Sequence, residues 1–199
     1  IYDNTGTRAL RVLGAGMMAG ATSPARPWFR LSTGDPDLNQ YQPVKIWLND
    51  VTQLMQTGFQ RSNTYRSLHQ MYEELGAFGT SASILLPDYN NVIHHYTLTC
   101  GEYAIATDWQ GQVCTLYREF ERPVSEVVKQ FGYKNCSTTV QNMYDRGSLD
   151  QWIRLIHAIE PRADRDIRKK DAKNMPWMSA YFEVGGNPDK YLRESGFEL

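Results

Sequence analysis

The sequence predicts an α+β fold, with helices first, then a mostly antiparallel meander, then short helices and further strands. Two patterns predict it. Before residue 80, apolar residues recur at three- and four-residue spacings, which is typical of amphipathic helices. After residue 80, short runs of β-branched and aromatic residues alternate with turn sequences. We therefore expect one domain over residues 1–199, mainly helical over 1–80 and mainly β with short helices over 81–199.

The first 40 residues contain one predicted helix and two irregular segments. The helix is expected over Thr5–Ala19, where the glycines of GAGMMAGA lower helix propensity but would let another backbone approach closely. Ser23–Leu31 contains two prolines and is expected to be extended, anchored by its two aromatic residues and Leu31. Ser32–Asp37 is expected to be a turn.

The strongest helical pattern begins at Pro43, where the missing N–H of proline costs nothing. Its apolar residues follow the spacing i, i+3, i+4, i+7, i+10 and i+11, namely Val44, Trp47, Leu48, Val51, Leu54 and Met55. A second helix is expected to be capped by Ser62 or Asn63 and to end at Gly76 or Gly79. Because few residues separate these two helices, we expect them to form an antiparallel hairpin.

A four-stranded meander is predicted after the hairpin. Its strands are Ser81–Leu86, Val92–Thr99, Glu102–Thr107 and Gln112–Phe120. They are separated by DYNN, CG and DWQG, which are plausible turn sequences. Apolar residues on both faces of the fourth strand indicate that helices cover both faces of the sheet.

Short helices and further strands are predicted in the last third. Pro123 opens a helix that Gly132 ends, and a weaker helix is expected over Ser137–Arg146. The further extended pieces are Gln151–Glu160, Trp177–Val184 and Tyr191–Glu198. A charged, exposed loop over Arg162–Lys173 and a GGNP turn connect them.

Composition excludes several classes of protein. The net charge of −1 gives no global sign of a nucleic-acid or membrane partner, and no apolar run approaches the ~20 residues that span a bilayer. No signal peptide is recognisable. Cys100, Cys114 and Cys136 lack CxxC spacing and are expected to be reduced thiols of a cytosolic protein. Because the sequence starts without Met, we expect a fragment of a longer polypeptide.

No catalytic, metal-binding or cofactor-binding motif is present. His94 and His95 are adjacent on a predicted strand, so their side chains should point to opposite faces and cannot share a metal unless a bulge intervenes. No nucleophile motif and no P-loop lysine occur. A small enzyme of unrecognised chemistry would require His94 or His157 to converge with Glu119 or Cys114 in a cleft.

The charged loop is the candidate DNA contact. Arg162–Lys173 holds six cations against three acids, and phosphate binding needs little more than clustered cations. The candidate residues are Arg165, Arg168, Lys169 and Lys170. The alternative is a solvated loop, because acids interleave with the cations and no aromatic platform accompanies them.

Six segments, taken in order, resemble the portal proteins (head-to-tail connectors) of short-tailed bacteriophages. They are TSPARPWFRL at 22–31, the helix pair at 44–80, GEYAIATDWQGQVCTLYREFERPVSEVVKQFG at 101–132, IHAIEPR at 156–162, WMSAYFEV at 177–184 and YLRESGFEL at 191–199. Together they cover nearly the whole chain, and the resemblance rests on their order and spacing rather than on any single motif.

The resemblance implies a structural virion protein and not an enzyme. Portal subunits form a ring of about twelve copies at one capsid vertex, a closed head-to-tail assembly that is put together in the host cytoplasm. The implied partners are terminase, capsid or scaffold proteins, tail proteins and the double-stranded DNA that passes through; neither a membrane nor a cofactor is implied. This chain would be the N-terminal, wing-like part of a longer subunit. Another phage head–tail adaptor protein is the alternative.

A head-to-tail ring requires two different, complementary surfaces on each subunit. Aromatic residues and arginine are enriched at interface cores, so Pro27, Trp28, Phe29 and Arg30 are the candidate subunit interface. A near-neutral surface also suits a channel in which DNA slides, because many fixed phosphate contacts would bind DNA tightly.

Overall fold

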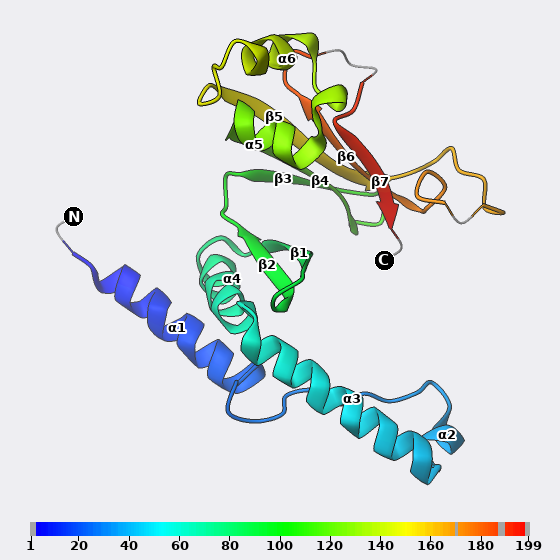
Figure 1. Ribbon diagram of the computed structural model, residues 1–199. Coiled ribbons are helices and arrows are strands. Elements are labelled where there is room, and N and C mark those ends of the chain that lie inside the picture. Colours follow the sequence, from blue (N-terminus) through cyan, green and yellow to red (C-terminus); the bar gives the residue numbers. More distant parts are fainter. Residues whose placement is uncertain (1–2, 170, 187–189, 198–199) are drawn as a thin grey trace. The chain divides into compact units, whose positions relative to one another are not determined.

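The computed structural model describes residues 3–169, 171–186 and 190–197. The chain divides into two compact units, an N-terminal unit (Ile1–Cys100) and a C-terminal unit (Gly101–Leu199) (Figure 1). The α+β prediction is confirmed, since the long helices end at Phe78 and the first strand begins at Ala82. The assignment of residues 1–199 to one domain stays a prediction. Lys170, the NP of the GGNP turn and Glu198 lie outside the described residues.

Four helices make up most of the N-terminal unit. They are α1 (Thr5–Ala21), α2 (Pro36–Gln40), α3 (Gln42–Arg61) and α4 (Thr64–Phe78). The short helix α2 replaces part of the predicted Ser32–Asp37 turn. Asp35 caps it by accepting a hydrogen bond from the Asp37 N–H at 2.9 Å, and Pro36 occupies the first turn, where its missing N–H is harmless.

The helix that packs along α4 is α1, and not α3. A Cβ added to Gly14 would lie 2.8 Å from Glu73 Cγ, and one added to Gly76 would lie 2.8 Å from Leu13 Cδ2, so glycines permit a close antiparallel approach of α1 and α4. The predicted α3–α4 hairpin is therefore wrong. Two residues, the extended Ser62 and Asn63, separate α3 from α4, and the chain only bends between the two helices (Figure 1).

A two-stranded sheet completes the N-terminal unit. Its strands β1 (Ala82–Asp88) and β2 (Val92–Leu98) pair antiparallel. Asn63 Nδ2 donates to the His95 carbonyl at 2.7 Å, and the His95 N–H donates to Asn63 Oδ1 at 2.8 Å. Asn63 therefore joins β2 to α4 instead of capping α4, whereas Ser62 Oγ accepts from the Thr64 N–H at 3.3 Å.

The C-terminal unit contains a five-stranded antiparallel sheet in the order β3-β4-β5-β6-β7. The strands are β3 (Tyr103–Thr107), β4 (Val113–Pro123), β5 (Trp152–Pro161), β6 (Trp177–Glu183) and β7 (Arg193–Phe197). The predicted strands are confirmed with small shifts in their ends. The predicted four-stranded meander is nevertheless divided, because β2 and β3 belong to different sheets.

Helices α5 (Val124–Phe131) and α6 (Thr138–Asp145), with a 3₁₀ turn at Tyr133–Asn135 between them, lie on one face of this sheet (Figure 1). The helices and the sheet enclose a core of Val124, Val127, Phe131, Cys136, Val140, Leu155, Tyr181 and Leu192. In this unit the helices cover one face only, which corrects the expectation that both faces are covered. The second face carries polar pairs such as Glu119–Arg154.

Burial differs sharply between the units. Among the described residues of the N-terminal unit, Leu98 is the only large apolar side chain that is fully buried. The other buried positions there are small or polar, namely Gly14, Thr22, Thr52, Thr64 and Ser67. The N-terminal unit therefore lacks an apolar core comparable to that of the C-terminal unit.

Candidate functional site

Only part of the apolar surface of α3 is buried within the N-terminal unit. Thr52 is the one fully buried residue of the helix; its Oγ1 donates to the Leu48 carbonyl at 2.7 Å and accepts from the Leu31 N–H at 3.4 Å. On the adjoining side of the helix, Trp47 is 62% exposed and Leu54 is 71% exposed. A helix that leaves such large apolar side chains in water is typical of a surface that binds another protein.

Trp47, Val51 and Leu54 follow the spacing i, i+4 and i+7, so they line one seam of the helix; we call these three residues the α3 ridge. The N-terminal half of α3 extends beyond the α1–α4 pair, with only α2 and the preceding segment beside it (Figure 1). The sequence pattern identified the helix correctly. It did not identify the ridge, because apolar periodicity is the same for a core face and an interface face.

The predicted interface segment is partly enclosed. Trp28 and Phe29 are half-buried, and both rings pack against Phe59 of α3, at centroid distances of 6.0 and 5.7 Å. Trp28 Nε1 also donates to the Tyr65 hydroxyl at 3.3 Å. These contacts confirm that the segment is anchored to the unit. Pro27 and Arg30 flank the two aromatic residues and remain exposed, and the role of the segment as a subunit interface stays a prediction.

A groove of about 980 Å³ lies between this segment and α3. Its lining is rich in carboxamides, including Asn49 and Gln53, and contains the cations Arg30 and Lys45 but no acidic side chain. Gln56 Nε2 is buried in this region without a hydrogen-bond partner. The groove and the α3 ridge both leave surface of α3 uncovered within the described part of the N-terminal unit.

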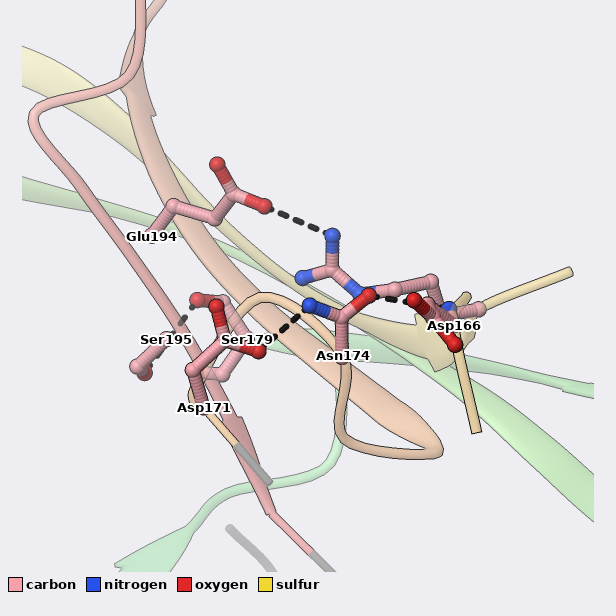
Figure 2. Close-up of polar contacts among 7 residues, drawn as sticks. Asp166, Asp171, Asn174, Ser179, Glu194 and Ser195 are labelled. Carbon is pink, nitrogen blue, oxygen red and sulfur yellow. Dashed lines mark hydrogen bonds and ion pairs between the residues drawn. The ribbon is translucent and has the colours of Figure 1, made fainter. Parts of the chain in front are cut away.

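The candidate DNA loop joins β5 to β6 and is held by its own polar contacts (Figure 2). The Asp166 N–H donates to Asn174 Oδ1 at 2.9 Å, and Asn174 Nδ2 donates to Asp171. Asp166 also accepts from the Arg168 N–H at 3.1 Å and lies 3.7 Å from Lys169 Nζ. Two of the three acids in the loop therefore shape its backbone.

The structure describes three of the four candidate cations. Arg165, Arg168 and Lys169 are exposed, which confirms the exposed loop, whereas Lys170 lies outside the described residues. Arg162 is different: its Nη1 donates to Glu194 Oε1 at 2.8 Å, and both side chains are more than three-quarters buried. The base of the loop is also packed on β7, since a Cβ on Gly196 would collide with the Ala172 carbonyl oxygen. DNA contact by the loop stays a prediction.

A row of aromatic and cationic side chains crosses the covered face of the C-terminal sheet. Register places Arg118, His157, Tyr181 and Arg193 on neighbouring strands in one line. The His157 and Tyr181 rings stack at 3.9 Å, and His157 Nε2 lies 2.9 Å from Ser179 Oγ. Burial, reinforced by the positive charges of Arg118 and Arg193, lowers the pKa of His157 to about 4. This histidine is neutral at pH 7 and structural.

Glu119 and His157, two of the residues that an active site would have to bring together, do not converge. Glu119 pairs with Ile156, one residue from His157, so the Glu119 and His157 side chains lie on opposite faces of the sheet. Glu119 forms an ion pair with Arg154 at 3.5 Å instead. Over the described parts of the chain, no three His, Cys, Asp or Glu side chains are grouped as a metal would require.

The cysteines and helices add two further observations. Cys100, Cys114 and Cys136 are all free thiols, respectively exposed, half-buried and buried. Burial raises the pKa of the Cys136 thiol, which keeps it protonated. No helix among the described residues has both the length and the apolarity needed to cross a bilayer.

Comparison with known proteins identifies the family to which this chain belongs. The sequence profile described as "Bacteriophage head to tail connecting protein" matches residues 1–199, so the chain belongs to the bacteriophage head-to-tail connecting protein family. It is 63% identical over 197 residues to a probable portal protein of Bordetella phage BPP-1, and 47% identical over 198 residues to the portal protein of Salmonella phage epsilon15. These alignments cover 99% and 100% of this chain.

The chain spans 36% of the length of each of these two relatives. The resemblance to phage head-to-tail connectors that the sequence segments indicated is therefore confirmed. The family is one of structural connecting proteins, and the two relatives carry the name portal protein.

Proposed function

We propose that this chain is part of a subunit of a ring-shaped portal, which joins head to tail at one capsid vertex and through which double-stranded DNA is packaged and ejected. The observation that carries the proposal is the match of all 199 residues to the connector family, together with 63% identity to a relative named as a probable portal protein. In this proposal the protein is a virion component that assembles in the host cytoplasm and catalyses no reaction of its own.

The proposal extends to the assembly partners. About twelve identical subunits would form a closed head-to-tail ring, which docks terminase, capsid or scaffold proteins and the tail. The exposed apolar residues of the N-terminal unit support an oligomer, because isolated soluble proteins rarely expose contiguous large apolar patches. The net charge of −1 is compatible with a channel that DNA traverses without being held.

Native mass spectrometry of the full-length protein tests this proposal. The expected result is a single closed oligomer near twelve subunits, which negative-stain microscopy resolves as a ring with a central channel. A protein that stays monomeric at high micromolar concentration would contradict the proposal, and the adaptor alternative would then be preferred.

The basic loop supports a second, narrower proposal, that Arg165, Arg168 and Lys169 contact DNA phosphates. Asp166 and Asp171 are engaged in the loop's own hydrogen bonds, which leaves the arginine side chains free to face solvent. The double variant Arg165→Ala/Arg168→Ala should lower the salt dependence of DNA binding by nearly two units of the log–log slope, since each lost phosphate contact removes about 0.9. An unchanged slope would overturn this second proposal.

A further inference from the structure

The N-terminal unit carries two exposed helix faces of opposite shape. The first is the α3 ridge, where the bulky side chains Trp47 and Leu54 stand 62% and 71% exposed. The second is a face of α1 that points away from α4; we call it the α1 outer face. Its exposed residues follow helical spacing and are Thr5, Ala9, Val12, Gly16 and Ala19.

The α1 outer face is shallow because its residues are small. A Cβ added to Gly16 would meet nothing within 4 Å, whereas one added to Gly14, on the opposite side of α1, would lie 2.8 Å from Glu73 Cγ. The glycine-rich sequence of α1 therefore has two sides, and only the Gly14 side is used within the unit. Val12, in the middle of the outer face, is 73% exposed. Small residues on a helix allow a bulky helix to approach closely.

The charges beside the two faces are opposite. Asp50 lies between Trp47 and Leu54 along α3, and α1 carries Arg8 and Arg11 with no acidic residue inside the helix. All three charged side chains are exposed, and none of them forms an ion pair with another described residue. Opposite charges at the edges of two apolar faces favour one pairing and one orientation.

We propose that the α3 ridge of one copy packs against the α1 outer face of a second copy of this chain, with Asp50 facing Arg8 and Arg11. The proposal rests on the ring proposed above and names the surfaces through which neighbouring subunits meet. Because the two faces differ, the contact is head-to-tail and repeats from copy to copy, as closure of a ring requires. With 17 and 20 residues, the two helices allow a contact up to about 25 Å long.

Charge reversal in the full-length protein tests the pairing. Asp50→Arg alone, and Arg8→Asp/Arg11→Asp alone, should each raise the subunit concentration for half-maximal assembly at least about tenfold in sedimentation velocity. The combined variant should return to within about threefold of the wild type, because the attraction is restored with its sign exchanged. Failure of the combined variant to recover would overturn the pairing.

Leu54→Glu tests the ridge itself, since a carboxylate would be buried at the contact. We expect loss of the ring and an unchanged thermal midpoint of the monomer. Tyr89→Glu is the matched control, because Tyr89 is fully exposed on the β1–β2 turn and belongs to neither face, and this variant should assemble normally. Unimpaired assembly of Leu54→Glu would overturn the inference.

Two other outcomes would distinguish failure of this inference from failure of the ring proposal. A Leu54→Glu monomer with a lowered thermal midpoint would show that the subunit's own chain covers the ridge, which overturns the inference and leaves the ring proposal standing. A wild-type protein that never assembles would overturn the ring proposal, and the inference with it.

Discussion

The two units differ in what they bury. The C-terminal unit encloses eight side chains between two helices and a sheet, and six of them are aliphatic or aromatic residues of α5, α6, β5 and β6. The N-terminal unit buries Thr52, Thr64 and Ser67 in comparable positions and leaves Trp47 and Leu54 exposed. Its helices α1 and α4 approach each other at glycines, with Gly14 against Glu73 and Gly76 against Leu13.

This difference indicates which unit depends on neighbours. Burial of apolar area is the main favourable term in folding, so the C-terminal unit carries the larger share of its stability internally. Large apolar side chains of the N-terminal unit, such as Trp47 and Leu54, are still exposed to water. They would contribute to stability only if another surface covered them. We therefore regard the C-terminal unit as the self-supporting part, and in the proposed ring the N-terminal unit would be the part that gains stability on assembly.

Matched leucine truncations should give the largest contrast between the units. Leu155 is fully buried, so Leu155→Ala should lower the free energy of unfolding by about 2–5 kcal/mol through lost burial and a residual cavity. Leu54→Ala removes the same atoms from an exposed site and should change stability of the unassembled protein by less than about 0.5 kcal/mol. Urea denaturation followed by circular dichroism measures both. Equal losses at the two sites would contradict the comparison.

Acid should destabilise the C-terminal unit through His157. Its pKa is about 4 when folded and near 6.5 when unfolded, so the unfolded state binds the proton first as pH falls. The contribution of the neutral His157 ring to the free energy of unfolding is fully present above about pH 6.5. About 3 kcal/mol of it is lost as the pH falls to 4. His157→Phe keeps a ring against Tyr181 and should remove this loss. Urea midpoints at pH 7 and pH 4 test it; an unchanged pH dependence in the variant would assign the loss elsewhere.

A glycine-to-alanine substitution in each unit should lower stability by different amounts. Gly196→Ala would place Cβ against the Ala172 carbonyl oxygen, a backbone atom that cannot move aside without shifting the loop. We expect a loss of about 1–3 kcal/mol. Gly76→Ala meets only the flexible Leu13 and Leu10 side-chain ends, so its cost should be smaller. Thermal unfolding of the two variants ranks them, and a larger loss at Gly76 would reverse the expected order.

The smallest expected effect is a gain in stability. Gly16 lies inside α1 with open space around it, so Gly16→Ala should stabilise the unassembled protein by up to about 1 kcal/mol through helix propensity. Gly14→Ala is the control, because its Cβ would press on Glu73 and offset the gain. Thermal midpoints of both variants, measured below the assembly concentration, decide the point. A destabilised Gly16→Ala variant would mean that this face of α1 is already occupied.

Local signals predicted the C-terminal unit well. The prediction of α5 from Pro123, Gly132 and the valines between them is confirmed, because Val124 and Val127 are fully buried and Gly132 adopts φ 86°. Long-range features could not be predicted in the same way. Ser62 or Asn63 was expected to cap α4. Ser62 accepts from the Thr64 N–H, but the Asn63 side chain bonds to the backbone of His95, 32 residues away, and no local pattern indicates that pairing.

The candidate functional surfaces likewise combine features that the local sequence predicts with features that depend on long-range contacts. The sequence correctly placed the basic loop at the surface, but it gave no sign that Arg162 turns inward to Glu194, 32 residues further along the chain. It proposed Trp28 and Phe29 as interface residues from their type alone, and their partial burial depends on Phe59 of another element. The α3 ridge was visible as apolar spacing, yet only the fold reveals which side of that helix stays uncovered.

Hydrogen exchange of the full-length protein, assembled and unassembled, tests the central contrast most directly. If the N-terminal unit gains its missing contacts from a second copy, amides of α1 and α3 should exchange at least about tenfold more slowly in the ring, while those of β5 and α5 stay equally protected in both states. Equal protection of α3 in monomer and ring, or slowing confined to the C-terminal unit, would contradict it.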